Sequence, residues 1–117
     1  MSKNLEQLFN EKNQMILKGQ IVEASEKFYA PKTKTIDFTG TTTNSKDEHT
    51  TTMKNFVAAL AKVNEISLRR SAVGDGVTFA EFVFDFDMKD GSKIYWHEIL
   101  LSNWENGLIV EEQYFKG

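Results

Sequence analysis

The sequence predicts an α+β domain with three helices on one face of a sheet, in the order α-α-β-α-β-β-β-β. Three observations predict it. Apolar residues recur at helical spacing through most of the first sixty residues. The last forty or so read as three consecutive strands, with turn signals at Asp90-Gly91 and Asn106-Gly107. Large apolar groups gather at even-numbered positions of these strands, so that one sheet face needs a cover.

Two amphipathic helices come first. Asn4 is placed to cap the first helix, and Gly19 ends it. Pro31 is expected to end the second, because the residue before a proline avoids the helical region. The first helix carries Leu5, Leu8, Phe9, Met15 and Ile16 on one stripe, and the second carries Ile21, Val22, Ser25, Phe28 and Tyr29.

A short strand and a third helix follow. Thr35–Phe38 alternates and reads as a strand, whereas the threonine-rich stretch Thr39–Asn44 reads as a loop. Ser45, with Glu48 three residues later, is a capping box for the third helix. Its inward residues are Met53, Phe56, Val57 and Leu60, and a strand over Asn64–Val73 comes next.

Three long strands are predicted over Val77–Met88, Lys93–Trp104 and Leu108–Lys116. Their register depends on turn length. Three-residue turns pair Met88 with Ser92 and Trp104 with Leu108, so that even positions face even positions. Asn-Gly is also the favoured two-residue turn, which leaves an alternative at the last hairpin. We predict three residues at both turns, because this register unites the aromatic side chains on one face. A register error of one residue would move every side chain to the other face.

The even face is predicted to form a ligand pocket, and two carboxylates share it. Glu98 is expected opposite Tyr114, and Glu112 opposite Leu100. Burial and a second carboxylate both raise a carboxyl pKa, so Glu98 with Glu112 or Tyr114 forms a hypothetical acid–base pair. The alternative is a structural ion pair of Glu98 with Arg69 or Arg70, which are expected to point to opposite faces. The predicted pocket wall consists of Phe82, Phe84, Trp96, Leu100, Trp104 and Val110.

The odd face is too apolar for a solvent-facing surface, and no predicted helix remains to cover it. A homodimer through this face is therefore expected. His97 is expected at that interface or surface, and His49 in a solvated first turn of the third helix. The proposed dimer face bears Phe79, Tyr95, His97, Ile99, Leu101 and Phe115, with Val83 and Ile109 on the same side.

Length, charge and composition exclude several classes of protein. The 117 residues predict one domain spanning 1–117, and 14 Lys+Arg against 17 Asp+Glu give a net charge of −3. No basic tract extends beyond Arg69-Arg70, which argues against nucleic acid as a partner. Without cysteine there is no disulfide or thiolate site. No metal-ligand spacing occurs, and no cofactor is required.

We expect neither a signal peptide nor a membrane span. The N-terminus lacks the apolar region of a signal peptide, and no apolar run reaches the ~20 residues needed to span a bilayer. A cytoplasmic protein without membrane contact is the expectation.

Four segments together resemble a known family. They are Glu26–Ala30, Thr35–Phe38, Ser45–Asp47, and Trp104–Glu112, the last similar to the pattern W-x-D/N-G-x-I-x-x-E. With these, the whole chain resembles the SnoaL-like branch of the NTF2-like superfamily. The resemblance implies a cone, in which a curved, mostly antiparallel sheet wraps the helices on its concave face and a pocket opens at one end. Many such proteins are homodimers that pack sheet against sheet.

The resemblance implies a fold more than an activity. Relatives include polyketide cyclases, ketosteroid isomerases, dehydratases, epoxide hydrolases and a nuclear transport carrier. The isomerases' tyrosine in the first helix has no counterpart here. We therefore expect a pocket for a small hydrophobic or cyclic molecule. The alternatives are a cyclase, isomerase or lyase that uses Glu98, and a non-catalytic dimeric module whose pocket its own side chains fill.

Overall fold

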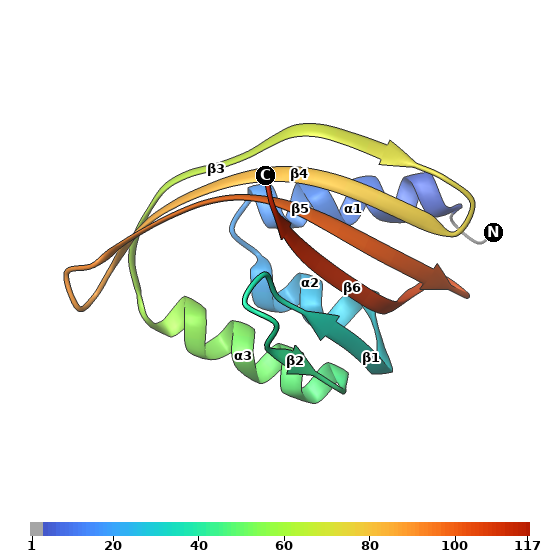
Figure 1. The fold of residues 1–117 in the computed structure, drawn as a ribbon, viewed down its shortest axis with the longest axis horizontal. Helices are drawn as coiled ribbons and strands as arrows, with labels where there is room; N and C mark the ends of the chain where they lie inside the picture. The colour runs from blue at the N-terminus through green and yellow to red at the C-terminus, as the bar shows by residue number, and fades with distance from the viewer. Residues whose placement is uncertain (1–3) are drawn as a thin grey trace.

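The computed structural model describes residues 4–117 and has nine elements (Figure 1). The helices are α1 (Leu5–Leu17), α2 (Ile21–Phe28) and α3 (Lys46–Ala58). The strands are β1 (Tyr29–Ile36), β2 (Thr42–Thr43), β3 (Leu60–Val73), β4 (Val77–Met88), β5 (Lys93–Glu105) and β6 (Leu108–Lys116). The predicted α+β class is confirmed, with one short strand more than expected.

The strands form one curved, open sheet with the order β2-β1-β6-β5-β4-β3. β1 runs parallel to β6, and the other neighbouring pairs are antiparallel. All three helices lie on the concave side, below the long arch of β3, β4 and β5, while the convex side has no helix over it (Figure 1). No helix within residues 4–117 has the length and apolar character needed to cross a membrane.

The predicted helix N-caps form. The capping box predicted at Ser45 is only half made within residues 4–117, because the Glu48 side chain accepts no hydrogen bond from the Ser45 N–H. The Asn4 side chain accepts a hydrogen bond from the Gln7 N–H at 2.9 Å, and Gln7 Oε1 accepts one from the Asn4 N–H at 3.0 Å. Ser45 Oγ accepts from the Glu48 N–H at 3.1 Å and starts α3. Gly19 has φ +80° and follows the last turn of α1, which glycine tolerates without strain.

The region around Pro31 differs from the prediction. α2 ends at Phe28, and Pro31 lies inside β1 instead of ending the helix. Proline is tolerated there because the pairing of β1 with β6 is interrupted between Tyr29 and Lys34, so no ladder bond to its missing N–H is lost. Of the strand predicted at Thr35–Phe38, Thr35 and Ile36 are the end of this longer strand and pair with the unforeseen β2. Asp37 and Phe38 lie outside the strand.

The strand expected over Asn64–Val73 also begins early, at Leu60. The third helix ends two residues before it, so Leu60 belongs to the sheet and not to the helix. Only Ala59 separates α3 from β3, so apolar residues of the helix and of the strand follow each other without a break. Their spacing does not show where the helix ends and the strand begins.

The turn between β4 and β5 has the three predicted residues. The Met88 N–H donates to the Ser92 carbonyl at 2.8 Å, and Gly91 has φ +89°. Phe84 consequently lies opposite Trp96, and Phe86 opposite Ile94. The aromatic side chains of the two strands meet on one face, as predicted.

The turn between β5 and β6 has two residues, so the three-residue prediction is wrong. Asn106 and Gly107 have φ of 52° and 80°, the pattern of a type I′ turn. Glu105 pairs with Leu108, and Trp104 with Ile109. A bulge then leaves Val110 without a partner. Beyond the bulge, even-numbered residues of β5 again pair with even-numbered residues of β6, as in Ser102–Glu112.

The bulge has three consequences for the predicted face. Glu112 and Tyr114 stay on the concave side, but opposite Ser102 and Leu100. Glu98 lies opposite Lys116, not Tyr114. Ile109, expected on the convex face, is fully buried in the core. That core also contains Phe9, Ile16, Ala24, Phe28, Tyr29, Ala80, Phe82, Phe84, Phe86, Leu100 and Trp104.

Candidate functional site

A cavity of about 340 Å³ lies between the helices and the concave face of the sheet. Of the predicted wall, Phe84, Trp96 and Leu100 line it. Phe82, Trp104 and Val110 do not. Phe82 is fully buried in the core, Trp104 is 6% exposed and donates through Nε1 to Thr78 Oγ1 at 2.9 Å, and Val110 sits at the bulge.

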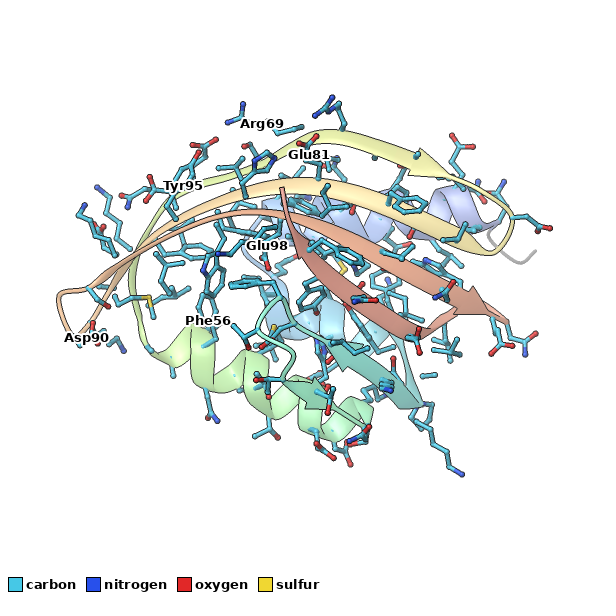
Figure 2. All side chains as sticks on the ribbon, in the orientation of Figure 1. Phe56, Arg69, Glu81, Asp90, Tyr95 and Glu98 are labelled. Atoms are coloured by element: carbon cyan, nitrogen blue, oxygen red, sulfur yellow. The ribbon has the colours of Figure 1, made fainter. Side chains whose placement is uncertain are left out.

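Aromatic rings from three distant segments make one wall of the cavity. Phe56 of α3 stacks on Trp96 of β5 with ring centroids 5.4 Å apart and planes 23° apart. Phe38, which follows β1, meets Trp96 edge-on at 6.0 Å. Phe56 also meets Phe86 edge-on at 5.4 Å. Figure 2 shows Phe56 pointing from α3 toward the sheet, on the side where Glu98 also lies.

Glu98 is the carboxylate that faces this cavity. It projects from β5, is 7% exposed and lines the wall. Within residues 4–117 it makes no hydrogen bond and no ion pair. Burial raises the pKa of Glu98 to about 7, and the negative charges of Glu112 and Asp37 add to this effect. Glu98 therefore has both protonation states available near neutral pH.

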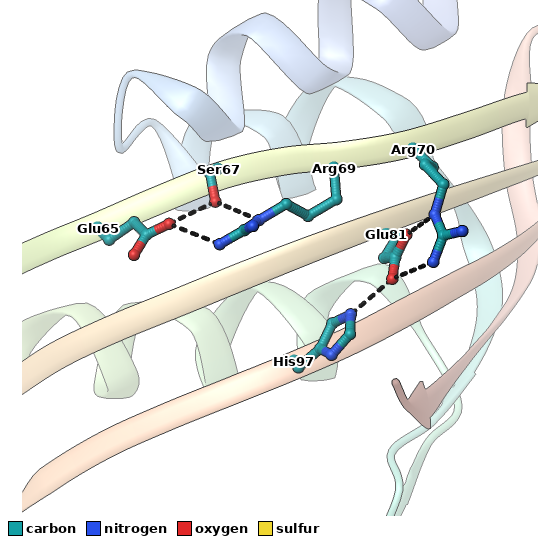
Figure 3. A network of polar contacts seen from close by, with 6 residues as sticks. All are labelled: Glu65, Ser67, Arg69, Arg70, Glu81 and His97. Atoms are coloured by element: carbon teal, nitrogen blue, oxygen red, sulfur yellow. Dashed lines mark hydrogen bonds and ion pairs between the residues drawn. The ribbon is translucent and has the colours of Figure 1, made fainter.

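The expected ion pair of Glu98 with an arginine is wrong. Arg69 pairs with Glu65 at 3.3 Å, and Arg70 Nε pairs with Glu81 Oε1 at 2.6 Å. The register shifts between Leu68 and Arg70, and both guanidinium groups lie on the convex side (Figure 3). The strict alternation that would send one of them inward is broken at this point.

Glu112 is a structural anion and does not line the cavity. It is fully buried and accepts hydrogen bonds from Lys12 Nζ at 3.3 Å, from Ser102 Oγ at 2.5 Å and from the Tyr29 hydroxyl. Burial opposes its ionisation, but the charge of Lys12 and these hydrogen bonds lower the pKa of Glu112 below its usual value. Lys12, on α1, is itself 1% exposed.

His49 and Tyr114 form a second polar group in the cavity wall. His49 Nε2 lies 3.1 Å from the Tyr114 hydroxyl, and Nδ1 lies 2.6 Å from Ser25 Oγ. The imidazole also stacks on Tyr29, with centroids 4.4 Å apart. Burial lowers the pKa of His49, so the ring is neutral at pH 7. The pKa of Tyr114 is raised by burial and by Glu112, which keeps its phenol protonated.

The prediction of a solvated His49 is therefore wrong, since the residue is 4% exposed. The sequence holds a signal for this position. His49, Met53 and Phe56 are spaced i, i+4, i+7, which puts the histidine on the inward face of α3. Its partners Ser25 and Tyr114 come from other elements and have no such signal.

A second polar cluster lies on the convex face (Figure 3). Glu81 accepts from Arg70 and contacts His97 Nε2 at 2.6 Å. The hydrogen bonds from Arg70 and His97 lower the pKa of Glu81 to about 2. The cluster is internally paired, and it places His97 on the side of the sheet where the sequence predicted it.

Within residues 4–117, no group of three or more His, Asp or Glu side chains is arranged to hold a metal ion. The polar groups that line the cavity include Glu98, Asp37, Lys12, the His49–Tyr114 pair and several threonine hydroxyls.

No protein-family model matches the sequence, and no curated protein does. Solved structures do match. A Mesorhizobium loti protein assigned as a SnoaL-like polyketide cyclase has a TM-score of 0.85, 18% identity and coverage of 97% of this chain and 99% of its own. An NTF2-like protein of unknown function from Burkholderia pseudomallei has a TM-score of 0.80, 12% identity and coverage of 99% and 92%.

A Catenulispora acidiphila protein with a ketosteroid isomerase-like fold, solved in complex with trimethylamine, has a TM-score of 0.73 and 13% identity. The match covers 88% of this chain and 80% of that one. These similarities cover nearly the whole chain at low identity, and they establish the fold. The chain has the SnoaL-like, NTF2-like cone fold that the sequence motifs predicted.

Proposed function

We propose that this protein binds a small, largely apolar, ring-containing molecule in the cavity, with the polar end of the ligand at Glu98. The observation that carries the proposal is a cavity of about 340 Å³ that combines an aromatic wall with a buried carboxylate, which has no hydrogen bond or ion pair within residues 4–117. Ligand sites usually begin at roughly 300 Å³ and pair an apolar lining with a few polar groups.

The unpartnered state of Glu98 supports a ligand. A buried carboxylate without hydrogen bonds is costly, and proteins keep such groups where something uses them. The volume left open also argues against the alternative of a pocket filled by its own side chains, because Trp96 and Tyr114 line the cavity without closing it.

A catalytic role for Glu98 is the second candidate. A carboxyl with a pKa near 7 exchanges protons efficiently at neutral pH, and the Tyr114 phenol beside His49 supplies a hydrogen-bond donor. Glu112 is a poor partner in such chemistry, because Lys12 and Ser102 hold it ionised. The assignment of the Mesorhizobium loti neighbour as a cyclase supports this candidate by fold analogy alone.

A thermal-shift screen of hydrophobic ring compounds tests the proposal. A variant whose cavity is filled by a larger side chain shows whether a ligand binds there. Leu100 lines the cavity and its neighbour Leu101 faces the other side of the sheet, so Leu100→Trp and Leu101→Trp form a matched pair. A ligand at 100 times its Kd stabilises by about 2.7 kcal/mol, a shift of several degrees. We expect this shift in wild type and Leu101→Trp and its loss in Leu100→Trp.

Equal ligand-induced shifts in both tryptophan variants would place binding outside the cavity and contradict the proposal. A hit is then incubated with wild type and Glu98→Gln, and its conversion is followed by mass spectrometry. Turnover that Glu98→Gln abolishes supports the catalytic candidate, and binding without turnover leaves the protein as a carrier or sensor.

A further inference from the structure

The charges around the cavity do not balance. The carboxylates that face or border it are Glu98 and Asp37, and the cation that lines it is Lys12. Lys12 Nζ is bound to the buried Glu112 at 3.3 Å, so these two opposite charges offset each other. His49 is neutral, since burial lowers its pKa. Glu98 is therefore left without a counter-charge.

Asp37 adds negative charge beside the cavity. One of its oxygens accepts hydrogen bonds from the Thr39 N–H, the Thr39 hydroxyl and the Thr41 N–H, at 2.6 to 3.0 Å. Burial opposes its ionisation, but these hydrogen bonds lower the pKa of Asp37, so it remains charged at neutral pH. Its charge is part of what disfavours ionisation of Glu98.

Within residues 4–117, Lys116 is the lysine that pairs with Glu98 across the strands and could compete for its charge. It lies opposite Glu98 in the β5–β6 ladder, but its ammonium sits 5.5 Å from the centre of the Phe38 ring and makes no ion pair with Glu98. The negative face of an aromatic ring attracts cations. Phe38 already holds an ammonium group in this way, and Trp96 and Phe56 present further rings inside the cavity.

We infer that the ligand of this cavity is a hydrophobic amine that binds in its protonated form. Its ammonium group lies against the Glu98 carboxylate, and its ring lies among Trp96, Phe56 and Phe84. This inference rests on the proposed function and names the chemical class of the ligand.

The alternatives fit the charges less well. A carboxylic acid would bring a third negative charge next to Glu98 and Asp37, with no unpaired cation in the wall to receive it. A neutral alcohol could hydrogen-bond to Glu98, but it would supply no counter-charge once the carboxyl group ionises. An aliphatic amine, whose pKa resembles the ~10.4 of lysine, is charged throughout the range in which Glu98 ionises. It therefore supplies the missing charge and an N–H donor together.

Three indole compounds of one skeleton test the inference by isothermal titration calorimetry at pH 8. They are tryptamine, tryptophol and indole-3-acetate, which carry a positive, no and a negative charge. We expect tryptamine to bind at least about tenfold more tightly than tryptophol, because its ammonium group forms a charge-assisted hydrogen bond. Indole-3-acetate should bind most weakly, because Glu98 and Asp37 repel its carboxylate. Glu98→Gln should weaken tryptamine at least about tenfold and leave tryptophol within about twofold.

The matched control is Glu111→Gln. Glu111 is exposed on β6 and lies on the opposite side of the strand from Glu112, outside the cavity. The Glu111→Gln substitution removes the same charge as Glu98→Gln, so any long-range effect of charge on tryptamine binding appears in both variants. We expect Glu111→Gln to keep tryptamine affinity within about twofold of wild type.

A pH series on wild type gives an independent readout that requires no variant. Tryptamine affinity should rise from pH 5.5 to pH 8 as Glu98 ionises, and the rise should be absent in Glu98→Gln. The other titratable or charged groups around Glu98 are Lys12, Asp37, His49, Glu112, Tyr114 and Lys116. Of these, neutral His49 is the one that a lower pH would charge. A rise of equal size in Glu98→Gln would assign the pH dependence to His49 and contradict the inference.

The amine inference and the proposed small-molecule cavity would be contradicted by different results. If tryptophol binds as tightly as tryptamine, or if Glu98→Gln leaves tryptamine affinity unchanged, the amine inference is wrong while the small-molecule cavity stands. If none of the three compounds binds and the wider thermal-shift screen finds no ligand, both proposals fall. Tryptophol binding by Glu98→Gln shows at the same time that the variant is folded.

Discussion

Glu98 and Glu112 project into the same interior from neighbouring strands, and their surroundings give them opposite behaviour. Glu112 has a cation and two hydroxyl donors, which offset the cost of burying its charge. Glu98 has none of these partners, so burial dominates and favours its protonated form. The difference identifies Glu112 as a paired structural anion and leaves Glu98 as the candidate for the proposed ligand site.

Glu98 should make the stability of the protein depend on pH. Its pKa rises from 4.5 to about 7 on folding, so the native state binds an extra proton between these values. The stability it contributes is complete below about pH 4.5 and is lost as pH rises through 7. We expect Glu98→Gln to gain up to about 3 kcal/mol of unfolding free energy relative to wild type between pH 5 and pH 8.

Urea unfolding of wild type and Glu98→Gln at both pH values measures this difference. A difference between the two proteins that does not change with pH would show that Glu98 titrates normally in the folded state.

Lys12→Met should be strongly destabilising, because it leaves the fully buried Glu112 without its cation. Breaking a buried ion pair in this way costs about 3–5 kcal/mol. Adding Glu112→Gln in the double variant should recover part of the loss. The control is Lys27→Met, which removes a half-exposed lysine that pairs with Glu11 at the surface and should cost at most about 1 kcal/mol.

Urea midpoints of the four proteins give these values. A cost for Lys12→Met no larger than that for Lys27→Met would mean that Glu112 gains its stability from Ser102 and Tyr29 alone.

At the scale of elements, the two hairpin turns decide the composition of the site. Lys89–Gly91 adopts the three-residue turn, whereas Asn106-Gly107 adopts the two-residue type I′ turn that suits its sequence. A single bulge at Val110 then restores the register. Without that bulge, Glu112 and Tyr114 would leave the interior, since a shift by one residue reverses a strand's faces.

Gly107→Ala should destabilise this hairpin. Gly107 has φ +80°, and an added Cβ would lie 3.4 Å from Leu8 Cδ1. We expect a loss of roughly 1–2 kcal/mol in unfolding free energy, because L-residues pay about that much in the left-handed region. Glu105→Ala, an exposed substitution beside the same turn, should change it by no more than about 0.5 kcal/mol. Equal effects in urea unfolding would contradict the assigned turn.

The element boundaries that were wrong share a cause. Pro31 was expected to end a helix, but it sits in a strand where no partner needs its missing N–H. β2 consists of two threonines that form a strand because β1 lies beside them. Local propensity carries no information on which strand lies beside a segment. The sequence of Thr39–Asn44 alone therefore does not predict the strand.

At the scale of the whole molecule, the convex face remains uncovered. Large apolar side chains on it are exposed, including Tyr95 at 64%, Phe79 at 42% and Phe115 at 40%. Arg69, Glu81 and Tyr95 lie above this face (Figure 2), and all three helices lie below. An apolar sheet face without a cover is typical of an interface, so the homodimer predicted from the sequence stays a prediction.

Tyr95→Glu combined with Phe79→Glu should shift such a dimer toward monomer. The two-fold symmetry would place two new carboxylates from each protomer in the interface, where burying them is costly. Sedimentation equilibrium over a range of concentrations measures the change. Thr51→Glu, on the exposed side of α3, is the control and should leave the association unchanged. A wild type that is monomeric at all concentrations would refute the dimer.

The sequence by itself determined the α+β class, the caps of α1 and α3, the three long strands and the aromatic inner face. Each of these depends on local spacing, on a side chain that meets its own backbone, or on strict alternation. Motifs near both ends also pointed to the cone fold. Glu98 was identified as a candidate because a charge on an apolar stripe is visible in the sequence.

Tertiary structure alone decided the state of each polar group in the site. Lys12 reaches Glu112 across one hundred residues, and His49 meets Tyr114 across sixty-five. The arginines next to Glu98 in the predicted pairing bind other carboxylates instead. Whether a buried charge is paired depends on which distant strands and helices converge on it. Spacing along the chain carries no such information. Only the folded molecule could therefore separate Glu112, which is paired, from Glu98, which makes no hydrogen bond or ion pair within residues 4–117.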